Sequence, residues 1–441
     1  MRATPQRAGR RIGERIAATT VALALGTVAG CSGGSSGSSG SGGSAKSHDA
    51  VIVWHGYTEV EAKAFTELGQ EWNKAHPDQK VNLTFGGSND DALKKTLASF
   101  VSGKTPGISY EYGSSITTLA KRSQTQDLTS LVKSSPSFHW EDFFVAVQQA
   151  ATTPDGKVYG VPALVDNLAL VYNKKLFDAA GLSYPMPNWT WTDFQNAARK
   201  LTNPAKHQYG WSYVNDGSED TVWRFIAMLW QAGGELLSPD GKKAAFDSPA
   251  GLAAMQLLHD MAVTDHSVYL ETGDGQYQNL FNSGKIAMLW TGPWDLSTIN
   301  KDVSYGAQVL PAKLTHATVA GPDNFMLFNK GDRATAWAFL QWLDSAETHL
   351  KFSIATGDLP LRESETKLPG YQDFIKKYPA NKVFVDNLAK NVTKSRPNIP
   401  EYPKISQVIG TAVQSVLLGK AQPQKALDQA RDQVDQILAG A

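Results

Sequence analysis

Cysteine is almost absent from this 441-residue chain, in which Cys31 is the single one. Without a second cysteine, neither disulfides nor thiolate metal sites can support the fold. Basic residues are not in excess either, because 42 Lys and Arg balance 42 Asp and Glu. Five of the arginines lie within the first fifteen residues, so the rest of the chain is mildly acidic. An acidic surface argues against nucleic acid as a partner, since nucleic-acid binding calls for basic patches.

The uncharged run near the N-terminus, Ile16 to Ala29, is too short to cross a bilayer as a helix. It follows the arginines and leads into Val28-Ala29-Gly30-Cys31, the order of a secretory signal with its cleavage site. That string resembles the lipobox of bacterial lipoproteins, which implies a lipid on Cys31. The alternative is a lone cysteine that behaves as a small core residue. Residues 32–44 are all Ser or Gly, a composition that forms a flexible tether and favours the anchor.

We therefore predict a lipoprotein signal peptide at 1–30, and a lipidated cysteine with its tether at 31–48. The expected location is the extracytoplasmic face of the cell membrane. The remaining chain is long for one ordinary core and suggests two lobes.

Catalytic motifs are scarce. The string Gly33-Gly34-Ser35-Ser36-Gly37 matches a nucleophile elbow but lies in the tether, without the strand and helix that this motif requires. Zinc-protease, dinucleotide-binding and calcium-loop motifs are missing from the sequence. The adjacent carboxylates Glu219-Asp220 and Asp90-Asp91 could form an acid/base pair for glycoside cleavage, but such neighbours are more often a solvated loop or a helix N-terminus. We expect no enzyme activity, no cofactor and no metal.

Short apolar runs alternate with segments of helical periodicity, which is typical of an α/β fold with a mostly parallel sheet. Expected helices include one through Phe65, Leu68 and Trp72 that stops at His76-Pro77, and one capped by Thr190 or Thr192. A further stripe from Val222 to Leu229 ends at Gly233-Gly234, and two helices cover the C-terminus from Ile405 to Ile437. Trp54 ends a buried run, so we expect it in the core. The expected strands are 51–54, 81–85, 108–110, 168–172, 286–290, 305–310 and 325–328.

Four longer strings stand out because each combines a turn with an extended segment. They are Asp155 to Pro162 followed by Asp166, Phe281 to Trp294 with its Gly292-Pro293-Trp294 end, Thr356 to Arg362, and Arg396 to Tyr402. In this order they resemble the extracellular solute-binding proteins of sugar ABC importers, the family that includes maltose-binding protein. The resemblance runs from about Val51 to Leu438.

That resemblance implies two α/β lobes joined by three crossovers, with a ligand between them and helices at the C-terminus. On this basis lobe one comprises 49–164 plus 311–357, and lobe two comprises 165–310 plus 358–441. Parallel sheets bind ligands beyond the carboxyl ends of their strands, which independently points to the loops 55–59, 86–91 and 111–115.

The resemblance also suggests roles for three residues. Trp294 is similar to a sugar-stacking tryptophan, although it could be a core residue beside a tight turn. Asp166 would accept hydroxyl hydrogen bonds, unless it only forms a turn. Arg362 would offer a bidentate fork, unless it forms an ion pair between the lobes. The complete set of predicted ligand-site residues is Trp294, Asp166, Arg362, Tyr57, Ser88, Asn89, Glu111, Ser114, Trp223, Gly292, Asn324 and Tyr402.

The sequence departs from maltose-binding protein after the third strand of lobe one. A Trp followed by an Asp-Arg pair is replaced here by Glu111-Tyr112-Gly113-Ser114-Ser115, so maltodextrin is not the expected ligand. The predicted function is capture of a mono- or oligosaccharide by hinge closure and its delivery to the transmembrane subunits of an ABC permease, by a monomer held at the membrane through its lipid. The alternatives are a binder of glycerol-3-phosphate or a polyol and, in another class, a secreted glycosidase.

Overall fold

The computed structural model describes residues 49–440, apart from 88–89, 274 and 391. The predicted signal peptide, Cys31 and the tether lie outside the described residues, as do Ser88 and Asn89. Across the part of the chain that is described, no helix is long and apolar enough to cross a membrane.

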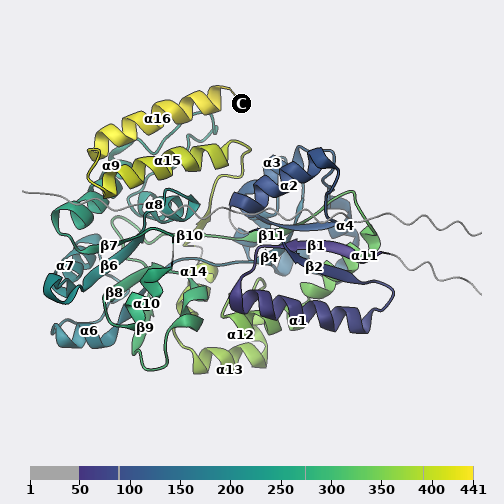
Figure 1. Cartoon of the computed structure of the whole chain (residues 1–441), viewed down its shortest axis with the longest axis horizontal. Coiled ribbons are helices and arrows are strands. Elements are labelled where there is room, and N and C mark those ends of the chain that lie inside the picture. The colour runs from purple at the N-terminus through teal and green to yellow at the C-terminus, as the bar shows by residue number, and fades with distance from the viewer. Residues whose placement is uncertain (1–48, 88–89, 274, 391, 441) are drawn as a thin grey trace, which may run out of the picture. The chain divides into compact units, whose positions relative to one another are not determined.

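The first sheet has five strands in the order β2-β1-β3-β11-β4. Strands β1, β2 and β3 are parallel, whereas β11 runs antiparallel to both β3 and β4. Helices cover both faces, with α1 and α12 in contact on one face and α2 and α3 on the other (Figure 1). The strands are β1 (Val51–His55), β2 (Val81–Phe85), β3 (Ile108–Tyr112), β4 (Gly160–Leu164) and β11 (Asp323–Leu327).

The second sheet also has five strands, in the order β7-β6-β8-β5-β9. Strand β6 pairs in parallel with β7 and β8, and β5 pairs antiparallel with β8 and β9. A separate parallel pair joins β10 (Thr318–Ala320) to β12 (Thr393–Ser395). The strands of the second sheet are β5 (Ala169–Asn173), β6 (Tyr209–Val214), β7 (Val268–Glu271), β8 (Ile286–Thr291) and β9 (Tyr305–Gln308).

The chain passes from the first sheet to the second between β4 and β5, and returns between β9 and β11. The lobe boundaries predicted after residues 164 and 310 fall in these two connections, and the one after residue 357 follows α12. How the chain divides into lobes stays a prediction. The arrangement is the α/β fold expected from the sequence, but the expectation of a mostly parallel sheet is wrong: each five-stranded sheet has two parallel and two antiparallel pairings.

Helices occupy most of the remaining described chain. Their N-termini follow familiar chemistry: in α7, Thr190 caps the backbone N–H of Asp193, and the Asp193 carboxylate accepts the N–H of Thr190. The helices are α1 (Glu59–Ala75), α2 (Asp90–Ser102), α3 (Ile116–Ala120), α4 (Thr129–Ser134), α5 (Val145–Ala150), α6 (Lys174–Ala179), α7 (Trp191–Leu201), α8 (Glu219–Gln231), α9 (Pro249–His259), α10 (Gln276–Asn282), α11 (Arg333–Leu343), α12 (Ala346–Thr356), α13 (Pro369–Lys377), α14 (Asn381–Ala389), α15 (Tyr402–Leu417) and α16 (Pro423–Ala439).

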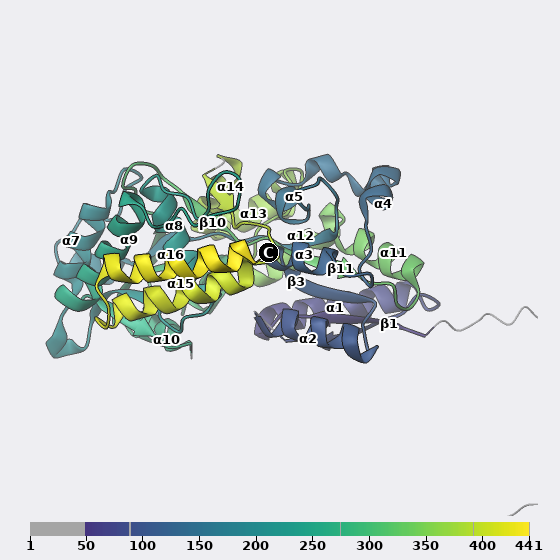
Figure 2. The same ribbon diagram turned by 90° about the horizontal axis from the view of Figure 1, so that it is seen from above.

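Short helical turns complete the described elements. Most are 3-10 turns: η1 (Gly113–Ser115), η2 (Pro136–Phe138), η3 (Trp140–Asp142), η4 (Pro204–Lys206), η6 (Pro293–Thr298) and η7 (Glu365–Lys367). A π-helical turn, η5 (Asp260–Thr264), continues α9. The predicted C-terminal helices are confirmed, and α15 and α16 lie side by side against α8 and α9 (Figures 1 and 2).

The expectation that Trp54 is a core residue is wrong. Strand β1 alternates, with Val51, Val53 and His55 buried, while Trp54 faces the other way and stays partly exposed. Its ring is covered by the Lys95 ammonium, which lies 4.4 Å from the ring centroid. The ring of Trp54 therefore lies under a cation, in a cation–π contact.

Candidate ligand-binding site

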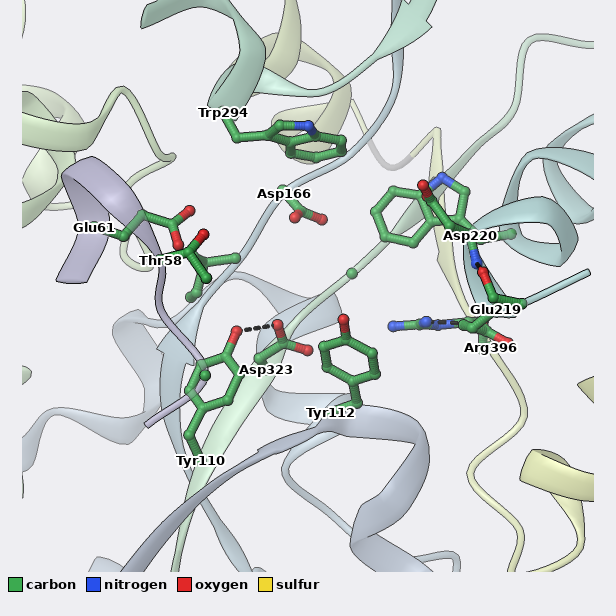
Figure 3. Close-up of a pocket in the computed structure, with 15 residues that line it drawn as sticks. Thr58, Glu61, Tyr110, Tyr112, Asp166, Glu219, Asp220, Trp294, Asp323 and Arg396 are labelled. Atoms are coloured by element: carbon green, nitrogen blue, oxygen red, sulfur yellow. Dashed lines mark hydrogen bonds and ion pairs between the residues drawn. The ribbon is translucent and has the colours of Figure 1, made fainter. Parts of the chain in front are cut away.

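A cavity of about 310 Å³ lies where the carboxyl ends of β1, β3 and β4 meet the N-terminus of α8. Its wall combines strand and loop residues of the first sheet with residues of α8 and of the loop at Trp294, which lie beside the second sheet. This is the position expected for a ligand site beyond the carboxyl ends of parallel strands. Figure 3 shows side chains from several elements facing one common space. The lining residues are Gly56, Thr58, Glu61, Tyr110, Tyr112, Leu164, Asp166, Ser218, Glu219, Asp220, Trp223, Trp294, Gly321, Asp323 and Arg396.

The wall from the first sheet is built on β3 and β11. Tyr110 on β3 donates its hydroxyl hydrogen bond to Oδ2 of Asp323, the first residue of β11 (Figure 3). The other oxygen, Oδ1, is buried and has no partner within the described structure. Burial raises the pKa of Asp323 to about 7, although the hydrogen bond from Tyr110 and the charge of Arg396 act in the opposite direction.

Asp166 enters the cavity from the connection between β4 and β5. Its Oδ1 atom is buried without a hydrogen-bond partner among the described residues. Burial raises the pKa of Asp166 well above its ordinary value, and the negative charges of Asp323 and Asp358 raise it further. Gly321 makes this placement possible: a Cβ at that position would lie 2.3 Å from Asp166 Oδ1 and 2.3 Å from the ring of Trp223.

The opposite wall, beside the second sheet, is formed by the N-terminus of α8. Ser218 caps this helix by accepting the N–H of Asp220. Glu219 forms an ion pair with Arg396 at 2.8 Å and accepts hydrogen bonds from the hydroxyls of Tyr402 and Ser406. Asp220 pairs with Arg224 one turn further along the helix. The acidic pair is thus a helix N-terminus, as its sequence favoured, and both residues also line the cavity.

Arg396, which follows β12, is the one cationic side chain among the described residues that line this cavity. Its guanidinium carbon lies 5.3 Å from the centroid of the Trp223 ring and 5.8 Å from that of Tyr112. Burial alone would lower the pKa of Arg396, but Glu219 outweighs it and the pKa is raised. Arg396 therefore remains charged and is committed to Glu219.

Two tryptophans supply the aromatic surface. Trp294 lies in η6, and Figure 3 shows its ring extending over the space that Asp166 faces. Its ring meets that of Trp223 edge-on, with centroids 6.0 Å apart and an interplanar angle of 78°. Gly292 lets the Trp294 ring fold back, because a Cβ at residue 292 would lie 1.7 Å from it. A second cavity of about 240 Å³ adjoins on this side and shares Thr58, Glu61 and Trp294.

The structure brings three of the predicted site residues together at the cavity: Asp166, Trp223 and Trp294. Gly292 shapes the same wall without lining it. Tyr402 lies behind it, where its hydroxyl donates to Glu219 at 2.7 Å. Ser114 lines a different cavity of about 350 Å³, which shares Arg396 with the first.

Three further predicted residues point away from the cavity. Tyr57 is buried and its hydroxyl donates to the carbonyl of Ala163 at 3.1 Å. Glu111 accepts the hydroxyls of Thr96 and Ser109 at 2.6 and 2.8 Å, and burial raises its pKa to about 7. The amide of Asn324 is buried against Gly160, where a Cβ would lie 2.6 Å from Oδ1.

Arg362 is also remote from the cavity. Its Nε donates to the carbonyl of Asp344 at 3.0 Å and its Nη1 to that of His139 at 2.9 Å. The guanidinium lies 3.6 Å from the centroid of the Phe143 ring. Burial lowers the pKa of Arg362, which the charge of Asp344 opposes. These contacts tie Arg362 to the segment 139–143 and to the residue after α11, so its guanidinium is used within the protein.

Of the three predicted loops, 55–59 contributes Gly56 and Thr58, and 111–115 contributes Tyr112. None of the described residues of 86–91 lines the cavity. The site residues missed from sequence include Thr58, Tyr112, Asp323, Glu219 and Arg396. No group of His, Cys, Asp and Glu suited to a metal ion occurs among the described residues.

Two α/β sheets with a polar, aromatic-lined cavity at their strand ends define a two-lobed fold of the periplasmic-binding-protein type. The family comparison agrees: residues 57–349 match the model of the bacterial extracellular solute-binding proteins, and the chain belongs to that family.

Individual relatives extend over most of the chain. A putative binding protein of Brucella abortus (strain 2308), BAB2_0491, is 29% identical over 304 residues, covering 67% of this chain and 71% of that protein. The sn-glycerol-3-phosphate-binding periplasmic protein UgpB of Brucella melitensis is 23% identical over 404 residues, covering 88% and 93%. The structure of a cyclic alpha-maltosyl-1,6-maltose binding protein from Arthrobacter globiformis superposes with a TM-score of 0.74 at 26% identity, covering 89% and 100%.

Proposed function

We propose that this protein captures a carbohydrate outside the membrane for an ABC importer. The observation that carries the proposal is the cavity surface, in which Trp294 and Trp223 stand near the carboxylates of Asp166 and Asp323. A sugar presents hydroxyl donors around its ring and apolar C–H patches on its faces. Carboxylate oxygens accept the former, and an indole ring covers the latter. The Arthrobacter relative, which is described as binding a cyclic oligosaccharide, supports this choice.

Capture would proceed by hinge closure. The lining residues come from the strands of the first sheet, from α8 and η6 beside the second sheet, and from the connections between them. A ligand that contacts both sides stabilises the conformation in which both are within reach. No bond is made or broken, so the carboxylates serve as hydrogen-bond acceptors.

The second candidate is glycerol-3-phosphate or a related ester, which the Brucella melitensis relative is described as binding. A phosphate group needs free cations or free backbone N–H groups. Arg396 is paired with Glu219, and the N-terminus of α8 carries its own acidic residues and a serine cap. This charge pattern favours a ligand without phosphate.

The lipid on Cys31 and the Ser/Gly tether would keep the binding unit close to its permease. A tether raises the effective concentration of a partner without adding contacts. We expect Cys31→Ala to leave sugar affinity unchanged and to reduce sugar uptake by cells. A Cys31→Ala protein with altered affinity would contradict this division of labour.

The test of the binding function is a ligand screen on the purified full chain. Thermal shift and calorimetry would compare neutral mono- and oligosaccharides with glycerol-3-phosphate and its diesters, because a ligand that binds the folded state raises its melting temperature. We expect shifts with sugars alone. A shift with the phosphates and none with any sugar would favour the second candidate, and release of product from a glycoside would show an enzyme.

A further inference from the structure

The cavity wall has far more negative than positive charge. Five carboxylates line it, from Glu61, Asp166, Glu219, Asp220 and Asp323, against the single guanidinium of Arg396 among the described residues. The two carboxylates on α8 are neutralised by arginines, since Glu219 pairs with Arg396 and Asp220 with Arg224. A neutral sugar would leave the excess of negative charge in the wall unchanged.

Asp166 and Asp323 differ from the α8 pair. Each keeps one buried oxygen without a hydrogen-bond partner, and no arginine or lysine in the described part of the chain forms an ion pair with either. Asp323 is only 6% exposed, and Figure 3 shows both carboxylates facing the same space beneath Trp294. A buried carboxylate oxygen without a donor is costly, and two such groups facing each other also repel.

Resting on the carbohydrate function above, we propose that the ligand carries a protonated amino group that binds between Asp166 and Asp323, so that the preferred substrate class is an amino sugar. The group supplies what the wall lacks, namely a positive charge together with several N–H donors.

A hydroxyl group meets only half of that need. It donates one hydrogen bond and leaves the negative charge in place, whereas an ammonium group donates up to three and neutralises charge. A hydrogen bond to a carboxylate is charge-assisted with either donor. With an ammonium group both partners are charged, so the attraction between the two charges is added to the hydrogen bond. The ring of Trp294 adds a surface that attracts cations. Burial and mutual repulsion raise the pKa of Asp166, and burial raises that of Asp323, which is the cost that a bound cation would relieve.

The experiment compares sugars that differ at one position. Calorimetry on the purified full chain at pH 7.5, above the pKa of about 7 of Asp323, would use glucose, glucosamine and N-acetylglucosamine, and then the β-1,4-linked disaccharides cellobiose, its di-amino form and its di-acetamido form. We expect the amino member of at least one series to bind about tenfold more tightly than both neutral members, as charge assistance predicts. The acetamido member controls for bulk, because it is neutral.

Variants then test whether the preference comes from the two aspartates. Asp166→Asn and Asp323→Asn keep the size and an acceptor oxygen but remove the charge, and the new amide oxygen at position 323 can still accept from Tyr110. We expect the ratio of amino to neutral affinity to fall in each variant and to approach one in the double variant. The matched control is Asp373→Asn on α13, whose carboxylate is exposed and paired with Lys376, and which should leave the ratio unchanged.

The outcomes separate the two proposals. Tight binding of a neutral sugar without preference for its amino form would overturn the amino-sugar inference and leave the carbohydrate function standing. No binding of any member, combined with binding of a phosphate ester, would overturn both. A preference that persists in the double variant would show that the cation is held elsewhere. The ratio in the unmodified chain decides the inference even if a variant fails to fold.

Discussion

Four carboxylates around the cavity form two pairs that differ in how their charge is balanced. Glu219 and Asp220, on α8, each meet an arginine. Asp166 and Asp323, beside the first sheet, form no ion pair with an arginine among the described residues. Each has one buried carboxylate oxygen without a hydrogen-bond partner there. The comparison teaches that acidic residues in one wall can have opposite purposes: the paired ones hold the wall together, and the unpaired ones are available to a ligand.

The largest expected effect is on stability, from Glu219→Gln. This change leaves Arg396 buried without its counter-charge and weakens the acceptor for Tyr402 and Ser406. Breaking a buried ion pair from one side costs about 3–5 kcal/mol in the free energy of unfolding. Denaturant unfolding followed by tryptophan fluorescence would measure it.

The control for that change is Glu235→Gln. Glu235 pairs with Lys394 at 2.8 Å, but both side chains are about half exposed. Exposed pairs contribute roughly 0–1 kcal/mol. Equal losses of unfolding free energy in the two variants would mean that the ion pair of Glu219 with Arg396 contributes no more to stability than an exposed pair.

The next effect is a pH dependence from Asp323. Its pKa is about 7 in the folded protein and near 3.8 when unfolded, so the folded state binds the extra proton between these values. Stability from this group therefore rises as pH falls from 7 towards 4. From pH 7 to pH 5 the gain is at most about 3 kcal/mol, since each pH unit contributes about 1.4.

Comparing the chain with Asp323→Asn measures this contribution together with the effect of the Asp323 charge on the pKa values of Asp166 and Glu111, which it raises. The titration of Asp344 is present in both proteins. The unmodified chain should gain melting temperature relative to the variant as the pH is lowered. If the melting temperatures of the two proteins change in parallel with pH, charges within the protein balance Asp323. Asp323 would then not differ from Glu219 in how its charge is compensated.

Trp294→Ala is expected to weaken sugar binding by about 2 kcal/mol, close to thirtyfold, the size of a loss at a central aromatic contact. Its side chain is partly buried. Its ring contacts one other aromatic ring, that of Trp223, whereas Trp342 contacts those of Trp72 and Phe339, so the melting temperature without ligand should change less than in the control. Trp342→Ala is the matched control: Trp342 is also partly buried, packs against Trp72 at 5.5 Å, and lies on α11 away from the cavity. That variant should lose stability and keep affinity. The reverse pattern would place Trp294 in the core.

The smallest expected effect on affinity comes from Arg362→Lys. Since Arg362 contacts backbone carbonyls and Phe143, the change should cost stability and leave sugar affinity within about twofold. The same replacement at Arg396 should reduce affinity, because that guanidinium faces the cavity between Trp223 and Tyr112. Similar losses of sugar affinity from both changes would contradict the assignment of Arg396 to the cavity wall and of Arg362 to contacts away from it.

Local patterns predicted many of the helices and strands, whereas the two-lobed architecture was expected from the resemblance to a family. The apolar run at β1, the stripe of α8 and the cap at Thr190 each depend on a few neighbouring residues. Periodicity also predicted the two C-terminal helices. The start of β11 was predicted two residues late, at Phe325, so Asp323 was expected in the loop before the strand.

The candidate site was predicted with a characteristic error of one residue. Sequence reasoning chose Tyr57, Glu111 and Asn324, whereas the cavity is lined by Thr58, Tyr112 and Asp323. In β3 and β11 successive side chains point to opposite faces, so a shift of one residue exchanges the cavity for the core. Tyr57 and Thr58 lie in the loop after β1, where no such alternation indicates which side chain faces the cavity. An apolar run locates a strand end, but the face that meets the second sheet depends on tertiary packing.

Arg396 was missed for a different reason. The string that contains it was singled out, yet its partner Glu219 is 177 residues earlier in the chain. Nothing local distinguishes an arginine that is bound for a buried ion pair from one on the surface. The two residues meet because β12, which precedes Arg396, pairs with β10, and β10 contacts α8, which begins at Glu219.

The absence of a side chain at Gly321 has a practical consequence. Because a methyl group there would collide with both Asp166 and Trp223, Gly321→Ala would force both side chains away from their present positions. One added carbon atom behind the wall would therefore disturb a carboxylate and an indole ring together, although neither residue is itself replaced.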